Sequence, residues 1–276
     1  MRGLDFNNYS ITSIDSITGF DIATGECVFI LDEIQDATIE GDAEVVWQTG
    51  REGRRLSALK RNKTCSITAN NGFIVGGLLR EQIGDTDPTI DMENATIEMP
   101  AFERLTVAGG AVETTFEAVG TAGAEIMWVY RQNRDSSQGE KFAQGASASA
   151  DTFAYDPATR TITLPTGEFE DGDMVIVFYN HLTRGVRYTN RSDQYAGDVR
   201  LVCDILVSDV CDGSMTHSKL VMSRASLSDN FSFTFGSDPA VQSFTAEAIA
   251  TVCGGEREFF YWVIPQLGDD PVVPVP

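Results

Sequence analysis

Residues able to do chemistry are sparse in this chain, and the acidic stretch DTDPTIDMEN is the best candidate for binding a cation. It places Asp85, Asp87, Asp91 and Glu93 at short spacing, and hard oxygen ligands of this kind can hold Ca²⁺. The stretch lacks the central Gly and the closing Glu of an EF-hand loop. We therefore interpret it as a solvated acidic turn and predict no metal site.

Nucleophilic and acid–base motifs are also missing from the sequence. Neither His181 nor His217 lies in an H-E-x-x-H pattern, and the chain has no P-loop and no G-x-S-x-G elbow. A Ser-His-Asp triad stays open, because its members need not be neighbours in sequence. The five cysteines form no C-x-x-C pair, so we interpret them as buried thiols, with an intersubunit disulfide as the alternative. We predict no cofactor and no enzymatic activity.

The stretch TGREGRRLSALKRNKT, residues 49–64, concentrates positive charge in an acidic chain. Residues 51–63 hold six of the 20 Lys and Arg and one acid, a local charge of 6 − 1 = +5, whereas the whole chain carries −21. So strong a negative charge disfavours nucleic acids and anionic membranes as partners, because phosphate groups bind where a surface is positive. The sequence therefore raises the question of which partner the basic stretch binds.

Three interpretations of the basic stretch stay open: a nucleic-acid-binding segment, a solvated loop, and a docking arm. The first is disfavoured because the stretch has no aromatic side chain to stack on a base. A docking arm would meet the acidic surface of another copy, where opposite charges give register and faster encounter. Leu56 and Leu59 would anchor such an arm in a neighbour's groove. We favour the docking arm.

The elements that must position these residues are predicted to be mostly short strands separated by turns. Apolar and polar residues alternate in ATIEGDAEVVWQTG, and many segments after residue 100 are also predicted to be strands. The spacing of these short strands along the chain is typical of a β-sandwich or barrel. In NNGFIVGGLLREQIG, residues 70–84, the period changes: Phe73, Ile74, Leu78 and Leu79 share a helical face, and Gly84 ends it. Two glycines within this short helix would allow close packing on a sheet.

Two segments are predicted to be irregular. Residues 135–150, DSSQGEKFAQGASASA, are of low complexity and favour a flexible loop. Residues 268–276, GDDPVVPVP, form a proline-rich tail that is either disordered or extended along a neighbour.

The order of features resembles the tail tube (major tail) proteins of tailed bacteriophages. Residues 19–79 show a hairpin, a strand ending in acidic residues, a long basic loop, a Thr-rich strand and a glycine-containing helix. Residues 152–180 are similar to a strand pair of that family, and residues 201–250 to its closing strands. Residues 100–150 do not match and are a candidate insertion in what we expect to be one domain, residues 1–276.

The resemblance implies a β-sandwich or split barrel with a short flanking helix and a long inter-strand loop. Six copies would form a ring, and stacked rings would form a tube that passes DNA. By position, residues 49–64 correspond to the loop that reaches an adjacent ring or subunit. The residues carried over as a self-assembly loop are Gly50, Arg51, Gly53, Arg54, Arg55, Leu56, Leu59, Lys60, Arg61 and Lys63.

We therefore expect a structural virion protein, assembled in the host bacterial cytoplasm, whose hexameric rings form the conduit for DNA ejection. Expected partners are further copies of the chain and other tail proteins: a sheath, a tape measure and a tail terminator. DNA would pass without specific binding. No apolar run has the length of a membrane span, and MRGLDFNNYS has no apolar signal region, so we expect neither membrane insertion nor secretion. The alternatives are a β-sandwich binding module, such as a capsid decoration or adhesin-like protein, and a β-rich hydrolase or lyase.

Overall fold

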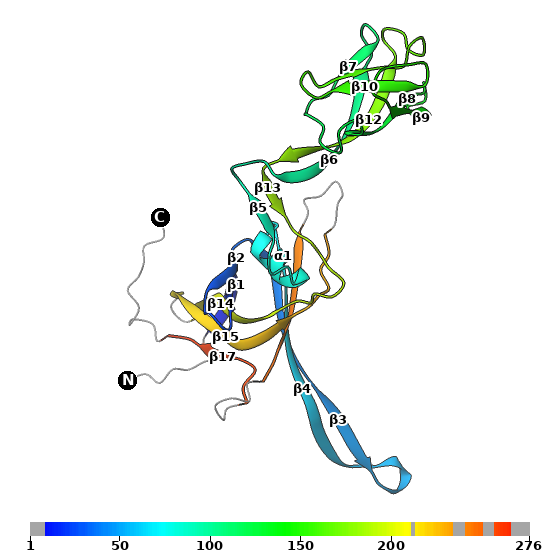
Figure 1. The fold of residues 1–276 in the computed structure, drawn as a ribbon. Helices are drawn as coiled ribbons and strands as arrows, with labels where there is room; N and C mark the ends of the chain where they lie inside the picture. The colour runs from blue at the N-terminus through cyan, green and yellow to red at the C-terminus, as the bar shows by residue number, and fades with distance from the viewer. Residues whose placement is uncertain (1–8, 211–212, 234–240, 251–256, 266–276) are drawn as a thin grey trace. The chain divides into compact units, whose positions relative to one another are not determined.

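The structure, a computed structural model, describes residues 9–210, 213–233, 241–250 and 257–265. The chain divides into two compact units, Met1–Asp87 with Tyr188–Pro276, and Pro88–Arg187 (Figure 1). We call them unit 1 and unit 2. The candidate insertion at residues 100–150 lies within unit 2. The predicted tail at residues 268–276 lies outside the described residues, as do two of the five cysteines, Cys211 and Cys253.

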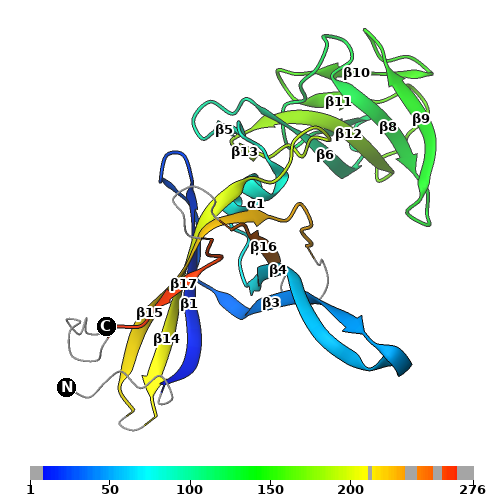
Figure 2. The same ribbon diagram turned by 90° about the horizontal axis from the view of Figure 1, so that it is seen from below.

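Strands make up most of the described chain, with one α-helix among the described residues, and this confirms the predicted fold class. Unit 1 is built on one sheet in the order β2-β1-β14-β15-β16-β4-β3, with β17 paired to β15. Figure 2 shows that this sheet curls, so that β3 and β4 turn away from β1, β14 and β15. The bounds are β1 (Tyr9–Asp21), β2 (Cys27–Leu31), β3 (Ile34–Thr49), β4 (Arg55–Asn71), β14 (Asp198–Asp209), β15 (Met215–Leu227), β16 (Gln242–Ala248) and β17 (Tyr261–Val263).

One side of this sheet carries the core of unit 1. Along β14 every second residue is buried, from Val199 to Val207, because successive side chains of a strand point to opposite faces. Phe244 of β16 and Met222 of β15 are buried in the same cluster. The alternation predicted from sequence therefore corresponds to a one-sided sheet.

The helix α1 (Gly76–Ile83) confirms the predicted helix and its end, since Gly84 adopts φ +66° at the C-cap. The predicted start was wrong: Phe73 and Ile74 precede the helix and are exposed. Gly77 explains the close packing, because a Cβ there would lie 2.1 Å from the carbonyl oxygen of Val28. No helix in the described part of the chain is long and apolar enough to span a membrane.

Unit 2 has a seven-stranded sheet in the order β6-β12-β8-β9-β10-β11-β7 and a two-stranded ribbon of β5 and β13. Its core is separate from that of unit 1 and centres on Phe153, Val177 and Tyr179. The bounds are β5 (Thr89–Asp91), β6 (Ile97–Thr106), β7 (Ala111–Glu113), β8 (Ile126–Gln132), β9 (Gln138–Gln144), β10 (Thr152–Asp156), β11 (Thr161–Thr163), β12 (Met174–Thr183) and β13 (Gly185–Arg187).

The flexible loop predicted at residues 135–150 is wrong in its middle, where β9 pairs with β8. Phe142 of β9 lies opposite Val129 and is buried in the core of unit 2. One buried aromatic ring thus anchors a segment whose composition is otherwise typical of a loop.

Candidate assembly surface

The acidic stretch uses its carboxylates to order the backbone. Asp91 accepts hydrogen bonds from the backbone N–H groups of Asn94 and Thr96 and from the Thr96 hydroxyl. These bonds, the hydroxyl first, hold the pKa of Asp91 well below its usual range. Asp85 accepts a bond from the backbone N–H of Thr189 at 2.8 Å. Within the described ranges, no group of three or more His, Cys, Asp or Glu is arranged to hold a metal ion.

The two histidines occupy different settings. His217 is exposed on β15, with its Nδ1 atom 3.1 Å from Asp204 and 3.5 Å from Asp15. His181 is buried in unit 2 and stacks on Phe116 with ring centroids 4.1 Å apart. His217 is part of a group of ion pairs on the surface, and His181 is packed inside unit 2 against an aromatic ring. We therefore interpret both histidines as structural.

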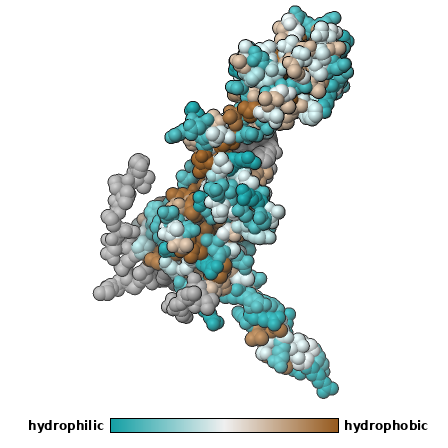
Figure 3. Space-filling view, viewed as in Figure 1, coloured by the Kyte–Doolittle hydropathy of each residue, from teal (hydrophilic) through white to brown (hydrophobic). Residues whose placement is uncertain are grey.

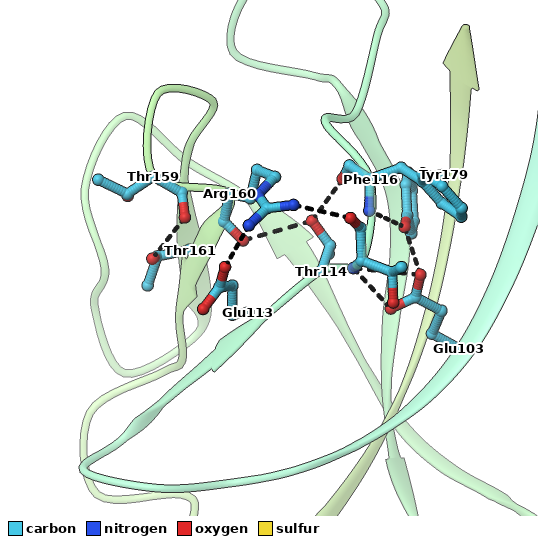
Figure 4. Close-up of polar contacts among 9 residues, drawn as sticks. Glu103, Glu113, Thr114, Phe116, Thr159, Arg160, Thr161 and Tyr179 are labelled. Carbon is cyan, nitrogen blue, oxygen red and sulfur yellow. Dashed lines mark hydrogen bonds and ion pairs between the residues drawn. The ribbon is translucent and has the colours of Figure 1, made fainter. Parts of the chain in front are cut away.

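A polar network beside His181 holds the segment that follows β7 (Figure 4). The Tyr179 hydroxyl donates to the Glu103 carboxylate and accepts a bond from the backbone N–H of Phe116. Glu103 also accepts a bond from the backbone N–H of Thr115 at 3.1 Å. The strand β7 ends at Glu113, because side chains bind the backbone groups that a longer strand would pair.

Alkaline pH should weaken unit 2 through this network. Burial, together with the bond to Glu103, raises the pKa of Tyr179 to about 12 from an ordinary value of about 10. The unfolded chain then loses this proton first, so the contribution is intact below pH 10 and is lost as pH rises through 12. The loss should be about 2–3 kcal/mol of unfolding free energy. Urea unfolding followed by circular dichroism at pH 9 and pH 11.5 measures it.

Tyr179→Phe should remove this part of the pH dependence while lowering stability at pH 9. Tyr195→Phe is the matched control, because Tyr195 is 73% exposed and should behave as the wild type. An unchanged pH dependence in Tyr179→Phe would contradict the assignment.

The predicted self-assembly loop lies on a long β-hairpin. β3 and β4 are joined by a short 3₁₀ turn, Arg51–Gly53, and pair along nearly their whole length. β16 pairs with β4 only over residues 66–71, so among the described residues the outer part is a ribbon of two strands. We call this outer part, residues 42–64, the arm; Figure 1 shows it extending from the sheet of unit 1.

The prediction of a loop for residues 49–64 therefore needs correction. The turn is irregular, with Glu52 at φ +65° and Gly53 at φ +73°, and β4 begins at Arg55. A second irregularity lies within the strands, where the register shifts between Asp42 and Glu44 and Asn62 adopts φ +50°. The reason is strand pairing: between Arg55 and Arg61 every residue except Leu56 faces a partner on β3, such as Leu59 opposite Val46 and Lys60 opposite Val45. All ten predicted assembly residues lie on the arm.

Both faces of the arm carry uncovered apolar side chains. On one face Val46 lies opposite Leu59, which is 63% exposed. The other face carries Trp47, 44% exposed, with the Arg55 guanidinium 4.5 Å from its ring centroid. Figure 3 shows apolar surface on the arm among hydrophilic residues. An isolated two-stranded ribbon is at best marginally stable in water, so an arm of this composition gains stability when a partner covers it.

The charges of the hairpin differ between its two strands. Four of the five acidic residues of the hairpin lie on β3, and the fifth, Glu52, lies on the turn; those on β3 are Asp36, Glu40, Asp42 and Glu44. The basic residues lie on the turn and β4: Arg51, Arg54, Arg55, Lys60, Arg61 and Lys63. β3 is the last strand of its sheet, so one edge of the hairpin is acidic and the other basic.

Three of the six cations are engaged within unit 1. Arg61 pairs with Glu44 at 2.7 Å and holds the pKa of that carboxyl below its usual value. Arg55 lies over Trp47, and the Lys63 ammonium is 5.9 Å from the Phe259 ring centroid. The other three, Arg51, Arg54 and Lys60, form no ion pair within the part of the chain that the structure describes.

Sequence reasoning missed the β3 side of this surface. Val45, Val46 and Trp47 precede the basic stretch, and their apolar character predicted a half-buried strand instead of an exposed one. A signal was available: in a hairpin centred between Glu52 and Gly53, Val45, Val46 and Trp47 fall opposite Lys60, Leu59 and Ala58.

An apolar groove lies beside the base of the hairpin, where residues of β1 and β3 line it. It has a volume of about 550 Å³ and runs between β1 and β3 under β17. Its apolar lining includes Ile11, Ile14, Ile34, Ile39, Leu220 and Trp262. Within the described residues, unit 1 therefore presents both a ribbon and a groove that no other segment covers.

Residues 143–257 match the model of the YomU/Tube protein family, which confirms the predicted resemblance to a phage tail tube family. The matched range contains parts of both units and does not include the arm. No curated protein sequence matches the chain.

Proposed function

We propose, on the premise that this chain is a phage tube structural protein, that its copies assemble through the arm into stacked rings. The arm is the observation that carries the proposal. It is a two-stranded ribbon with apolar side chains on both faces, one acidic edge and one basic edge. A protein that stays monomeric would cover or shorten such a ribbon, because unpaired strand edges invite pairing between chains.

The two edges differ in charge, which favours a head-to-tail contact. The acidic β3 edge of one copy would meet the basic turn and β4 edge of the next, so that a different patch is used on each side. Contacts of this kind close into a ring when the rotation between copies allows it, and we propose six copies per ring. The ribbons would then pair edge to edge around a central channel.

The channel of the stacked rings would conduct DNA during ejection. A chain of net charge −21 repels phosphate over most of its surface, so DNA would pass without binding. In this proposal the basic groups of the arm are neutralised by neighbouring copies, and the chain has no catalytic role. The mature protein would reside in the virion tail after assembly in the host cytoplasm, in contact with a sheath, tape measure or tail terminator.

Electron microscopy of the purified full chain tests the proposal. Negative-stain images at rising protein concentration should show rings or tubes with a central hole, and top-view averages should show sixfold symmetry. Monomers that persist at high concentration, at low and at high salt alike, would count decisively against assembly. Rings of another symmetry would support assembly into a tube and would correct the proposed number of copies per ring.

A further inference from the structure

The outer face of unit 2 carries a cluster of aromatic rings on β6, β12 and β8. Phe178 of β12 lies directly between Phe102 of β6 and Trp128 of β8. The Phe102 and Phe178 ring centroids are 5.1 Å apart, and those of Tyr130 and Phe178 are 6.1 Å apart. We call this surface, with its neighbouring cations, the aromatic face; its residues are Phe102, Arg104, Trp128, Tyr130, Lys141 and Phe178.

The aromatic face does not belong to the core of unit 2. Val129 and Val177, one residue along their strands, point to the opposite side and are fully buried there. Phe102 and Trp128 remain 53% and 42% exposed. Side chains of this size would stabilise the chain further if they were covered, so they mark the face as a place where another molecule binds.

Two cations lie on the aromatic rings. The Lys141 ammonium is 3.0 Å from the Trp128 ring centroid, and the Arg104 guanidinium is 5.5 Å from that of Phe102. Neither cation forms an ion pair within the described residues. Unit 2 as a whole has 7 Lys and Arg against 15 Asp and Glu over residues 88–187, a charge of 7 − 15 = −8. The aromatic face is therefore a local positive site on an acidic unit.

Aromatic rings with Arg and without carboxylates are typical of the central, tightly binding part of a protein–protein interface. The rings are tilted against one another by 47° and 87°, so they form no flat stack of the kind that successive bases or sugar rings occupy. The charge of −8 on unit 2 also disfavours a nucleic acid. Shape and charge together favour an acidic polypeptide.

We propose that the aromatic face binds an acidic surface on a second copy of this chain. The choice of a second copy rests on the proposed function, because a tube holds many identical acidic chains side by side. Outside residues 88–187 each chain carries −21 + 8 = −13, and opposite charges at a repeated contact give register as well as attraction. This contact is separate from the arm and would hold unit 2 in place on the assembled tube.

Radical footprinting of the full chain tests this contact, with one tryptophan reporting on each surface. Trp128 reports on the aromatic face and Trp47 on the arm. Oxidation is measured by mass spectrometry at low and at high protein concentration. We expect Trp128 to be oxidised several-fold more slowly at high concentration. Equal oxidation of Trp128 at both concentrations overturns the proposal, whether or not Trp47 is protected.

The two tryptophans separate this proposal from the proposed function. Protection of Trp47 alone would support assembly through the arm and overturn the contact at the aromatic face. Protection of Trp128 alone would support the contact at the aromatic face and count against assembly through the arm. If Trp128 responds only to added alginate, an acidic polysaccharide, the ligand is a sugar and the second copy is wrong.

Substitutions at the face complete the test. Phe102→Ser and, separately, Arg104→Glu should abolish the protection of Trp128 at high concentration and leave that of Trp47 unchanged. Both sites are exposed, so folding should be retained, which circular dichroism checks. Tyr195→Ser, which removes an exposed ring from unit 1, is the control and should leave both tryptophans as in the wild type. Retained protection of Trp128 in Phe102→Ser and in Arg104→Glu would overturn the proposal.

Discussion

Replacing the three free cations of the arm, Arg51, Arg54 and Lys60, by Glu is expected to stop assembly and to leave the chain folded. These side chains are exposed and have no ion-pair partner within the described residues, so their reversal breaks no contact inside the chain. Each would lose an attraction to the acidic strand of a neighbour and gain a repulsion. Close charge pairs across an interface couple by about 1.5 kcal/mol or more. Three lost pairs should raise the concentration needed for assembly on the order of 100-fold or more.

The measurements are negative-stain microscopy and sedimentation velocity over a range of concentrations, with circular dichroism to check folding. The matched control is Arg134→Glu, Arg191→Glu and Arg200→Glu, three exposed cations away from the arm. Both variants carry the same net charge, −21 − 6 = −27, so a general effect of charge would appear in both. Normal tubes from the arm variant would exclude the docking role.

The structure explains why the other cations of the arm are less suitable for this test. Reversing Arg61 would place a second carboxylate against Glu44 within the arm, and reversing Arg55 would remove its contact with Trp47. A loss of assembly in those variants would report a distorted hairpin as readily as a lost contact between copies.

Phe153→Ala is expected to destabilise unit 2 by about 3–5 kcal/mol. The Phe153 ring is fully buried at the centre of the unit 2 core, and its removal leaves a cavity that the surrounding strands fill only in part. Unit 1 has its own core, so we expect its stability to change much less. Hydrogen exchange followed by mass spectrometry distinguishes the two, with peptides from β12 reporting on unit 2 and peptides from β14 on unit 1.

In the variant, β12 amides that exchange by unfolding of unit 2 should exchange on the order of 100-fold faster or more. Those of β14 should be nearly unchanged. Phe244→Ala, which removes a buried ring from the core of unit 1, is the reciprocal control and should accelerate β14 instead. Equal acceleration of both strands by either substitution would mean that the two units unfold as one.

Local patterns in the sequence determined much of the fold. Alternation of apolar and polar residues after residue 100 predicted strands, and in residues 198–209 the structure buries every second residue from Val199 to Val207. Gly84 predicted the end of the helix, because glycine has no Cβ and readily adopts the positive φ of a C-cap. The structure confirms this with φ +66° at Gly84. Composition likewise determined that the chain is acidic and that its largest basic cluster lies in residues 51–63. Each of these properties depends on residues that are close together in the chain.

Only the tertiary structure decided which of those residues are available to a partner. Arg61 is neutralised by Glu44, 17 residues earlier, and this pairing depends on the register of β3 against β4. The basic stretch became a strand, and the low-complexity segment became β9, because each found a partner strand that local composition does not specify. Phe102, Phe178 and Trp128 are far apart in sequence and adjacent in the sheet. Strand pairing joins residues that are far apart in the chain, so local patterns do not specify it. The sequence by itself determined where the strands lie and what charge they carry. The pairing of the strands decided which cations and aromatic rings stay exposed.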